Sequence, residues 1–106
     1  MDIISNQEEL VLLAVGSLQP EAYAYGIQKE IKAETKKGIS LGTIHTILYR
    51  LENSGMLKSH LGGSSTTRGG RSKRLFSLTT KGYRVVEDLR LVRQAFWKRI
   101  SPDQIA

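Results

Sequence analysis

The sequence predicts a small α+β domain, mostly α-helical, built from four helices and one β-hairpin. Two observations carry this prediction. Apolar residues recur at helical spacing in four segments that capping residues, glycine or proline separate. Two short alternating runs flank a glycine-rich stretch, which is typical of a hairpin. At 106 residues the chain has the length of a single domain.

The first helix is expected to begin after Ser5. Ser5 and Glu8 have the spacing of a capping box, in which each side chain accepts a hydrogen bond from the other residue's backbone. Residues 10–18 are apolar nearly all round, so we expect this helix to be buried on more than one side. Pro20 and the Gly-Ser pair before it mark the end of the helix.

Two short helices follow, joined by a tight turn. The second is expected over residues 24–36, with Gly38 as the residue that caps its C-terminus. Ser40 offers an N-cap to the third helix, and Gly55 ends it. Two short helices joined in this way form the helix-turn-helix pattern. The apolar stripe expected to bury the third helix is Ile44, Ile47, Leu48 and Leu51.

A β-hairpin is expected after the third helix. Residues 57–61 and 73–78 alternate in polarity and predict two short strands. The segment between them is rich in glycine and contains Arg68 and Arg71. Such a hairpin directly after a helix-turn-helix is a wing, so the predicted fold is a winged helix-turn-helix.

The last helix is expected to start at the Thr79 cap and to run to about Ile100, because Pro102 disfavours helix at the residue before it. A helix of about 20 residues spans about 30 Å, roughly the diameter of a small domain. Its distal half then has nothing in the same chain to cover it, and we expect a homodimer seam formed by the last and first helices. The residues expected at this seam are Leu10, Ala14, Val85, Leu89, Val92, Phe96 and Ile100.

Positive charge is concentrated in the middle third of the chain. The formal net charge of the chain is +6, whereas residues 50–84 alone carry eight basic residues and one acidic residue. Concentrated cationic charge is typical of a protein that binds a polyanion. Because this region spans the end of the third helix and the wing, the charge favours binding to nucleic acid.

The exposed face of the third helix is the candidate recognition surface. Gly42 and Thr43 are small enough to let the helix N-terminus approach a phosphate, and Tyr49 and its neighbours could reach base edges in a major groove. The wing cations have the reach for backbone or minor-groove contacts. The predicted DNA-binding residues are Ser40, Gly42, Thr43, His45, Thr46, Tyr49, Arg50, Arg68, Arg71 and Lys73.

Other classes of function find little support in the residues. The chain has no cysteine, no Ser–His–Asp set and no phosphate-binding Gly-Lys-Ser/Thr loop, so we expect no enzyme, no metal and no cofactor. The longest strictly apolar run, residues 10–15, is far too short to span a bilayer, and no leader is seen, so a cytoplasmic protein is expected. Two alternatives stay open: a sequence-neutral architectural nucleic-acid binder and a helix-turn-helix module that binds protein.

Several short segments, in their order and spacing, resemble the PadR family of transcriptional regulators. The matching segments are residues 25–27, 40–44, 48–57, 69–79 and 81–82. The resemblance extends over roughly residues 7–90, and a single helix after the wing is similar to the short subgroup of the family. It implies a dimeric winged helix-turn-helix that binds double-stranded DNA, usually as a repressor and often relieved by a small molecule.

This resemblance implies an organisation in two parts within one compact unit. Residues 1–78 would form the DNA-binding domain and residues 79–106 the dimerisation helix. A dimer of this kind would bind a pseudo-palindromic operator. Phe96 and Trp97 could line an effector site for a flat apolar or aromatic molecule between the subunits, or they could be plain interface core.

Overall fold

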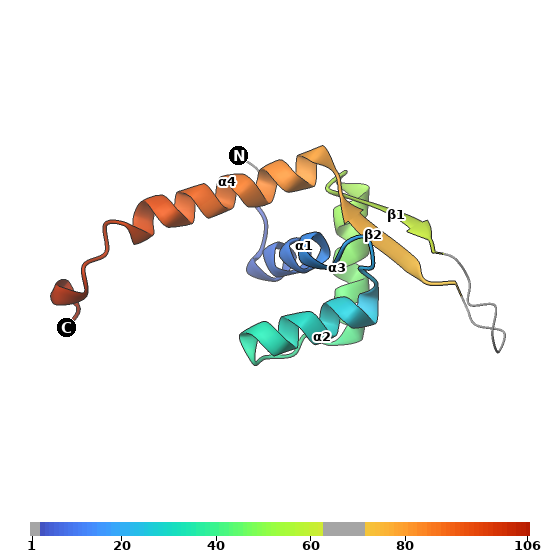
Figure 1. Cartoon of the computed structure of the whole chain (residues 1–106), viewed down its shortest axis with the longest axis horizontal. Coiled ribbons are helices and arrows are strands. Elements are labelled where there is room, and N and C mark those ends of the chain that lie inside the picture. Colours follow the sequence, from blue (N-terminus) through green and yellow to red (C-terminus); the bar gives the residue numbers. More distant parts are fainter. Residues whose placement is uncertain (1–2, 63–71) are drawn as a thin grey trace.

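The computed structural model describes residues 3–62 and 72–106. Helices α1, α2 and α3 form the body of the molecule, the hairpin projects from one side, and α4 extends away on the other (Figure 1). The order of elements confirms the predicted fold class. The elements are α1 (Asn6–Leu18), α2 (Ala24–Thr35), α3 (Leu41–Asn53), β1 (Leu57–Leu61), β2 (Arg74–Leu78), α4 (Thr80–Trp97) and a short 3-10 turn (Pro102–Gln104).

Helix α1 is the centre of the core. The Ser5 hydroxyl accepts a hydrogen bond from the Glu8 backbone N–H at 3.1 Å, and the Glu8 carboxylate accepts one from the Ser5 N–H at 2.7 Å, which confirms the capping box. Val11, Leu12 and Val15 are completely buried because α2, α3, β2 and α4 all pack against this helix. The prediction of burial on more than one side is therefore confirmed.

The turn between α2 and α3 differs from the prediction at its first residue. Lys36, not Gly38, takes the left-handed conformation that closes α2, with φ of 64°. The reason lies in Thr35, whose hydroxyl donates to the carbonyl of Ile31 at 2.8 Å and accepts from the Lys37 N–H at 3.1 Å. These bonds offer the backbone an alternative to a further helical turn. The Ser40 cap on α3 is confirmed, since its hydroxyl accepts from the Thr43 N–H at 3.1 Å.

Strands β1 and β2 pair antiparallel, with Leu57 opposite Leu78 and Leu61 opposite Arg74. The second strand thus begins one residue later than expected. Ala22, just before α2, extends this small sheet because its carbonyl accepts a hydrogen bond from the Phe76 N–H at 2.8 Å. The two strands are therefore attached to the body along β2.

Helix α4 begins at the predicted cap, where the Thr79 hydroxyl accepts from the Gly82 N–H at 3.1 Å. The helix ends at Trp97, three residues before the predicted Ile100. The reason is a tightening of the last turn, in which the Ile100 N–H bonds to the carbonyl three residues before it instead of four. Within the described ranges, no helix is both long and apolar enough to cross a membrane.

Candidate nucleic-acid interface

Helix α3 has one buried face and one open face. Each residue of the predicted apolar stripe is at most 3% exposed, which confirms the predicted orientation of the helix. The stripe consists of Ile44, Ile47, Leu48 and Leu51. The six predicted contact residues on the other side are all exposed: Gly42, Thr43, His45, Thr46, Tyr49 and Arg50. Tyr49 is 70% exposed and stands out from this face. The sequence therefore presents a row of small, hydroxyl, aromatic and cationic side chains along one open helix surface.

A polar cleft of about 500 Å³ runs along the α1 side of this face. Ser5 and Gln7 from the start of α1 form its second wall, and sequence reasoning did not assign either of them to the site. The lining residues are Ser5, Gln7, Ser40, Gly42, Thr43, Thr46, Ile47 and Arg50. The start of α1 thus belongs to the same surface as the predicted contact residues of α3.

Arg50 is held in place at one end of this cleft. Its guanidinium lies 3.3 Å from the carboxylate of Glu8, whose side chain is 13% exposed, while the Arg50 side chain is itself 59% exposed. The Ser5 N–H, and after it the Arg50 guanidinium, hold the pKa of Glu8 below its ordinary value, although partial burial acts in the opposite direction. Arg50 is therefore oriented on one side and open to a ligand on the other.

A second groove, of about 450 Å³, separates the start of α3 from the base of the wing. The Lys73 ammonium group lies 4.1 Å from the centroid of the Tyr23 ring, and Lys29 lies 5.5 Å from that of Tyr25. These distances are within the range of cation–π contacts. The lining residues are Tyr23, Ala24, Tyr25, Leu41, His45, Lys73, Arg74 and Phe76.

The predicted interface residues are thus brought together on one surface wherever the structure describes them. His45 and Lys73 line the groove at the wing, and Arg50 lines the cleft at α1. Arg68 and Arg71 lie outside the described residues. The two tyrosines and Arg74 were missed by sequence reasoning, because only the folded chain brings the start of α2 beside the wing.

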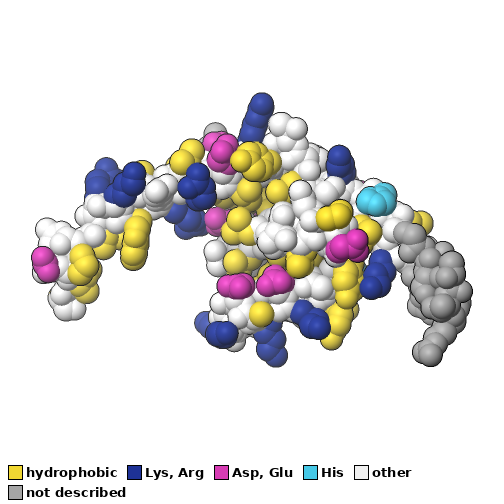
Figure 2. Space-filling model, viewed as in Figure 1, with side chains coloured by type: hydrophobic (Ala, Val, Ile, Leu, Met, Phe, Trp, Pro, Cys, Tyr) yellow, Lys and Arg dark blue, Asp and Glu magenta, His cyan; other side chains and the backbone are white. Residues whose placement is uncertain are grey.

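The predicted seam residues divide into two groups. Val85 and Ala14 are 5% and 6% exposed and belong to the core of the same chain. The first turns of α4 carry Val85 against the body, and Ala14 of α1 lines the groove toward α2. Leu10 and Leu89 are half-buried against that core. The seam prediction therefore rests on the outer residues, with Val92 40%, Phe96 59% and Ile100 52% exposed. Figure 2 shows hydrophobic side chains on the side of outer α4 that faces the hollow beside the body.

The two predicted effector residues also lie on this outer segment. Trp97 is 71% exposed and lines a shallow groove with Arg90, Arg93 and Gln94. Phe96 lies under the guanidinium of Arg99, 5.1 Å from its ring centroid. Both rings are open to a partner molecule, whether a second copy of the chain or a ligand held between two copies.

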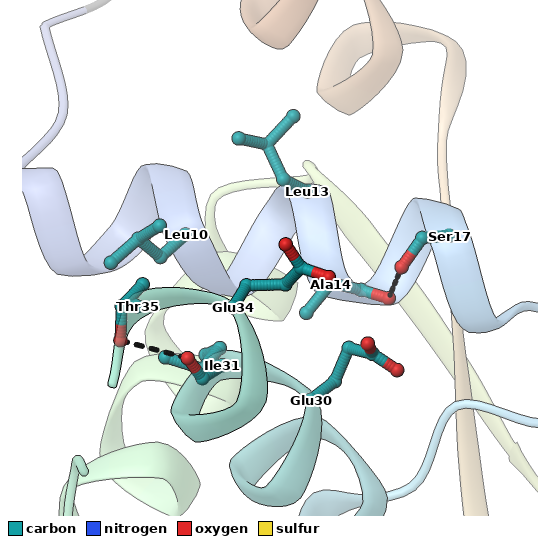
Figure 3. Close-up of a pocket in the computed structure, with 8 residues that line it drawn as sticks. All are labelled: Leu10, Leu13, Ala14, Ser17, Glu30, Ile31, Glu34 and Thr35. Atoms are coloured by element: carbon teal, nitrogen blue, oxygen red, sulfur yellow. Dashed lines mark hydrogen bonds between the residues drawn. The ribbon is translucent and has the colours of Figure 1, made fainter. Parts of the chain in front are cut away.

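An apolar groove of about 410 Å³ lies between α1 and α2. Figure 3 shows Glu30 and Glu34 along its α2 rim and Leu10 and Leu13 on α1. Among the described residues, no three side chains of metal-binding type gather at one place.

Comparison with known proteins gives one family and one fold. The model of the family described as "Transcriptional regulator PadR-like family" matches residues 11–88. A comparison with curated protein sequences finds no match.

Among solved structures, a PadR-like transcription factor from Bacteroides fragilis matches with a TM-score of 0.71 at 24% identity, covering 87% of this chain and 84% of that chain. A PadR-like regulator from Bacillus cereus matches with a TM-score of 0.70 at 20% identity and the same coverages. FabT of Streptococcus pneumoniae, solved in complex with DNA, matches with a TM-score of 0.67 at 23% identity, covering 97% of this chain and 63% of that chain. These structural matches establish a shared fold.

Proposed function

The chain belongs to the PadR-like family of transcriptional regulators, since the family model covers most of its length, and from this premise we propose that it binds double-stranded DNA sequence-specifically as a homodimer. The observation that carries the proposal is the open face of α3. It presents the six exposed contact residues between a polar cleft and a cationic groove. FabT, a protein of the same fold, has been solved in complex with DNA, which supports DNA binding by this chain.

The proposed mode of binding places α3 in the major groove. Thr46 and Tyr49 then face base edges and thymine methyl groups, and Arg50 binds guanine or a phosphate. The phosphate backbone on either side of the helix lies over the two flanking grooves, where Ser5 and Gln7 on one side and Lys73 on the other supply donors. Arg68 and Arg71 extend the contact along the wing.

The proposed assembly uses the two parts of the chain differently. Residues 1–78 bind DNA and residues 79–106 dimerise, and the two parts form one unit because the first turns of α4 pack against the body. The outer apolar side chains of α4 form the seam. The two recognition helices then enter successive major grooves about 34 Å apart, on a pseudo-palindromic operator.

We further propose that the protein acts as a repressor in the cytoplasm and uses no cofactor. An effector that relieves repression would be a small aromatic or apolar molecule bound between the subunits near Phe96 and Trp97. Such a molecule releases DNA only if it prefers the dimer geometry that mismatches the operator, because equal affinity for both states shifts nothing.

The test of this proposal compares two arginine variants on one DNA site. Genomic fragments are selected on purified protein, and the affinity of the enriched site is measured by fluorescence anisotropy at fixed salt. We expect Arg50→Ala to weaken binding by about 1–3 kcal/mol. Arg84→Ala removes the same charge from an exposed position on α4 and serves as the matched control. Equal affinities for the two variants would contradict the assignment of α3 as the recognition helix.

A further inference from the structure

The first turn of α1 holds two consecutive carboxylates that bind arginines from two different elements. Glu8 pairs with Arg50 of α3 at 3.3 Å. Glu9 accepts two hydrogen bonds from Arg93 of α4, from Nε at 3.1 Å and from Nη2 at 2.5 Å. One rigid, capped turn therefore connects the recognition helix to the dimerisation helix.

The Glu9–Arg93 pair lies where α4 leaves the body. Leu89 is the last residue of α4 that is not exposed, and Arg93 follows it by one helical turn. Glu9 is 8% exposed and is the one buried charged residue in the described part of the chain. A bidentate arginine–carboxylate pair fixes orientation as well as distance. The Arg93 side chain is itself 62% exposed, so the pair joins a buried carboxylate of α1 to the open outer half of α4.

That direction matters for any dimer built on the outer half of α4. About eight residues separate Leu89 from Trp97, where α4 ends, a length of about 12 Å as helix. A tilt of about 15° would displace this end by about 3 Å, close to the 3.4 Å step between successive base pairs, so a modest tilt of α4 would shift a subunit attached there by about one base pair.

We propose that Glu9 and Arg93 are positioning residues that set the half-site spacing which the dimer accepts. The inference rests on the proposed function, since it presumes a dimer on a two-part operator. Glu9 and Arg93 need not touch DNA for this role. They hold α4 at a fixed angle to the turn that also holds Arg50, and so fix where the partner's recognition helix lies.

The first experiment measures spacing preference on the selected operator. Three DNA duplexes carry the natural spacing, one base pair fewer and one base pair more between the half-sites. We expect the unmodified protein to prefer its natural spacing by about tenfold or more, the cost of roughly one mismatched position. Glu9→Gln and Arg93→Gln should each reduce that preference to about threefold or less, while Arg90→Gln, a matched change one turn away on α4, should leave it intact.

Arg93→Lys separates bidentate geometry from charge, because lysine keeps the charge and cannot form the paired hydrogen bonds. We expect Arg93→Lys to show nearly the same reduced spacing preference as Arg93→Gln. An unchanged spacing preference in both Glu9→Gln and Arg93→Gln would overturn the proposal. The proposal would also be overturned if Glu9→Gln and Arg93→Gln lowered the affinity equally for all three duplexes. That result would indicate a merely structural role, which weakens binding without changing the preferred spacing.

A second experiment needs no DNA. The chain has no native cysteine, so spin labels can be placed at Tyr49→Cys in α3 and Leu91→Cys in α4. Labelled chains diluted with unlabelled chains report the distance within one subunit. We expect a narrow distribution that broadens in Arg93→Gln and not in Arg90→Gln, and equal widths would overturn the positioning role. If selection yields no operator, the proposed function fails while this distance measurement still decides whether the pair orients α4.

Discussion

Gly82 fixes how closely α4 approaches the loop before β1. It is the third residue of α4, and its N–H donates to the Thr79 hydroxyl at 3.1 Å. A Cβ atom built at this position would overlap the carbonyl oxygen of Met56. That carbonyl also accepts a hydrogen bond from the Thr79 N–H at 3.1 Å. The overlap is therefore with a held backbone group, which cannot move aside as the end of a flexible side chain would. In Gly82→Ala, α4 must therefore move by about 1 Å or more.

The expected cost combines two opposing effects. Overpacking a tight contact costs about 1–3 kcal/mol, and a displaced α4 also loosens the packing of Val85 and Val86. In the opposite direction, alanine stabilises a helix by up to about 1 kcal/mol relative to glycine. We expect Gly82→Ala to lower the free energy of unfolding by about 2 kcal/mol. Gly42→Ala is the matched control: nothing lies within 4 Å of the added Cβ, so it should raise that free energy by about 0.5–1 kcal/mol.

Urea unfolding followed by circular dichroism measures both variants. All samples need one protein concentration, because the stability of a dimer depends on concentration. The two midpoints should move in opposite directions from that of the unmodified chain. A Gly82→Ala protein at least as stable as Gly42→Ala would refute the close approach of α4 to Met56.

Three further predictions follow from the structure. Replacing Lys36 by glycine should stabilise the fold by about 1 kcal/mol in urea unfolding, because its left-handed backbone penalises a side chain; a loss of stability would contradict that conformation. The pKa of Glu8 is lowered from its ordinary value of 4.5, so its stabilising contribution is present above that pH and is lost as the pH falls through the folded-state pKa. The unfolding free energy should therefore fall less steeply on acidification in Glu8→Gln than in the unmodified chain, and parallel pH profiles would argue against the bonds of Glu8 to the Ser5 N–H and to Arg50. Val92→Asp combined with Phe96→Asp should give a monomer in sedimentation, since both side chains are exposed in one chain and a buried charge at the seam is costly; a persistent dimer would place the seam elsewhere.

The parts of the fold that depend on nearby residues could be predicted from the sequence. The Ser5, Ser40 and Thr79 caps are all present, because each depends on a backbone N–H three residues away. The buried stripe of α3 follows from helical spacing alone. The end of α2 could not be predicted in the same way, because the hydroxyl of Thr35 competes for the backbone where the sequence offered Gly38 as the cap.

The candidate site shows the same division between local and distant information. The open face of α3 was predicted residue by residue, since a helix with a known buried stripe has a known opposite face. The pair of Glu8 with Arg50 spans 42 positions of sequence and that of Glu9 with Arg93 spans 84. No local pattern identifies such partners, and only the packing of α1 between α3 and α4 brings them together.

We propose that the open face of α3 distinguishes one DNA sequence from another. The most direct test compares the affinity of the protein for its enriched genomic site with that for a scrambled copy of equal length and composition, at about 150 mM salt. We predict an inverted repeat bound about 10³-fold more tightly than the scrambled copy. Equal binding to both duplexes, with a steep loss of affinity as salt rises, would contradict the claim and identify a sequence-neutral architectural protein.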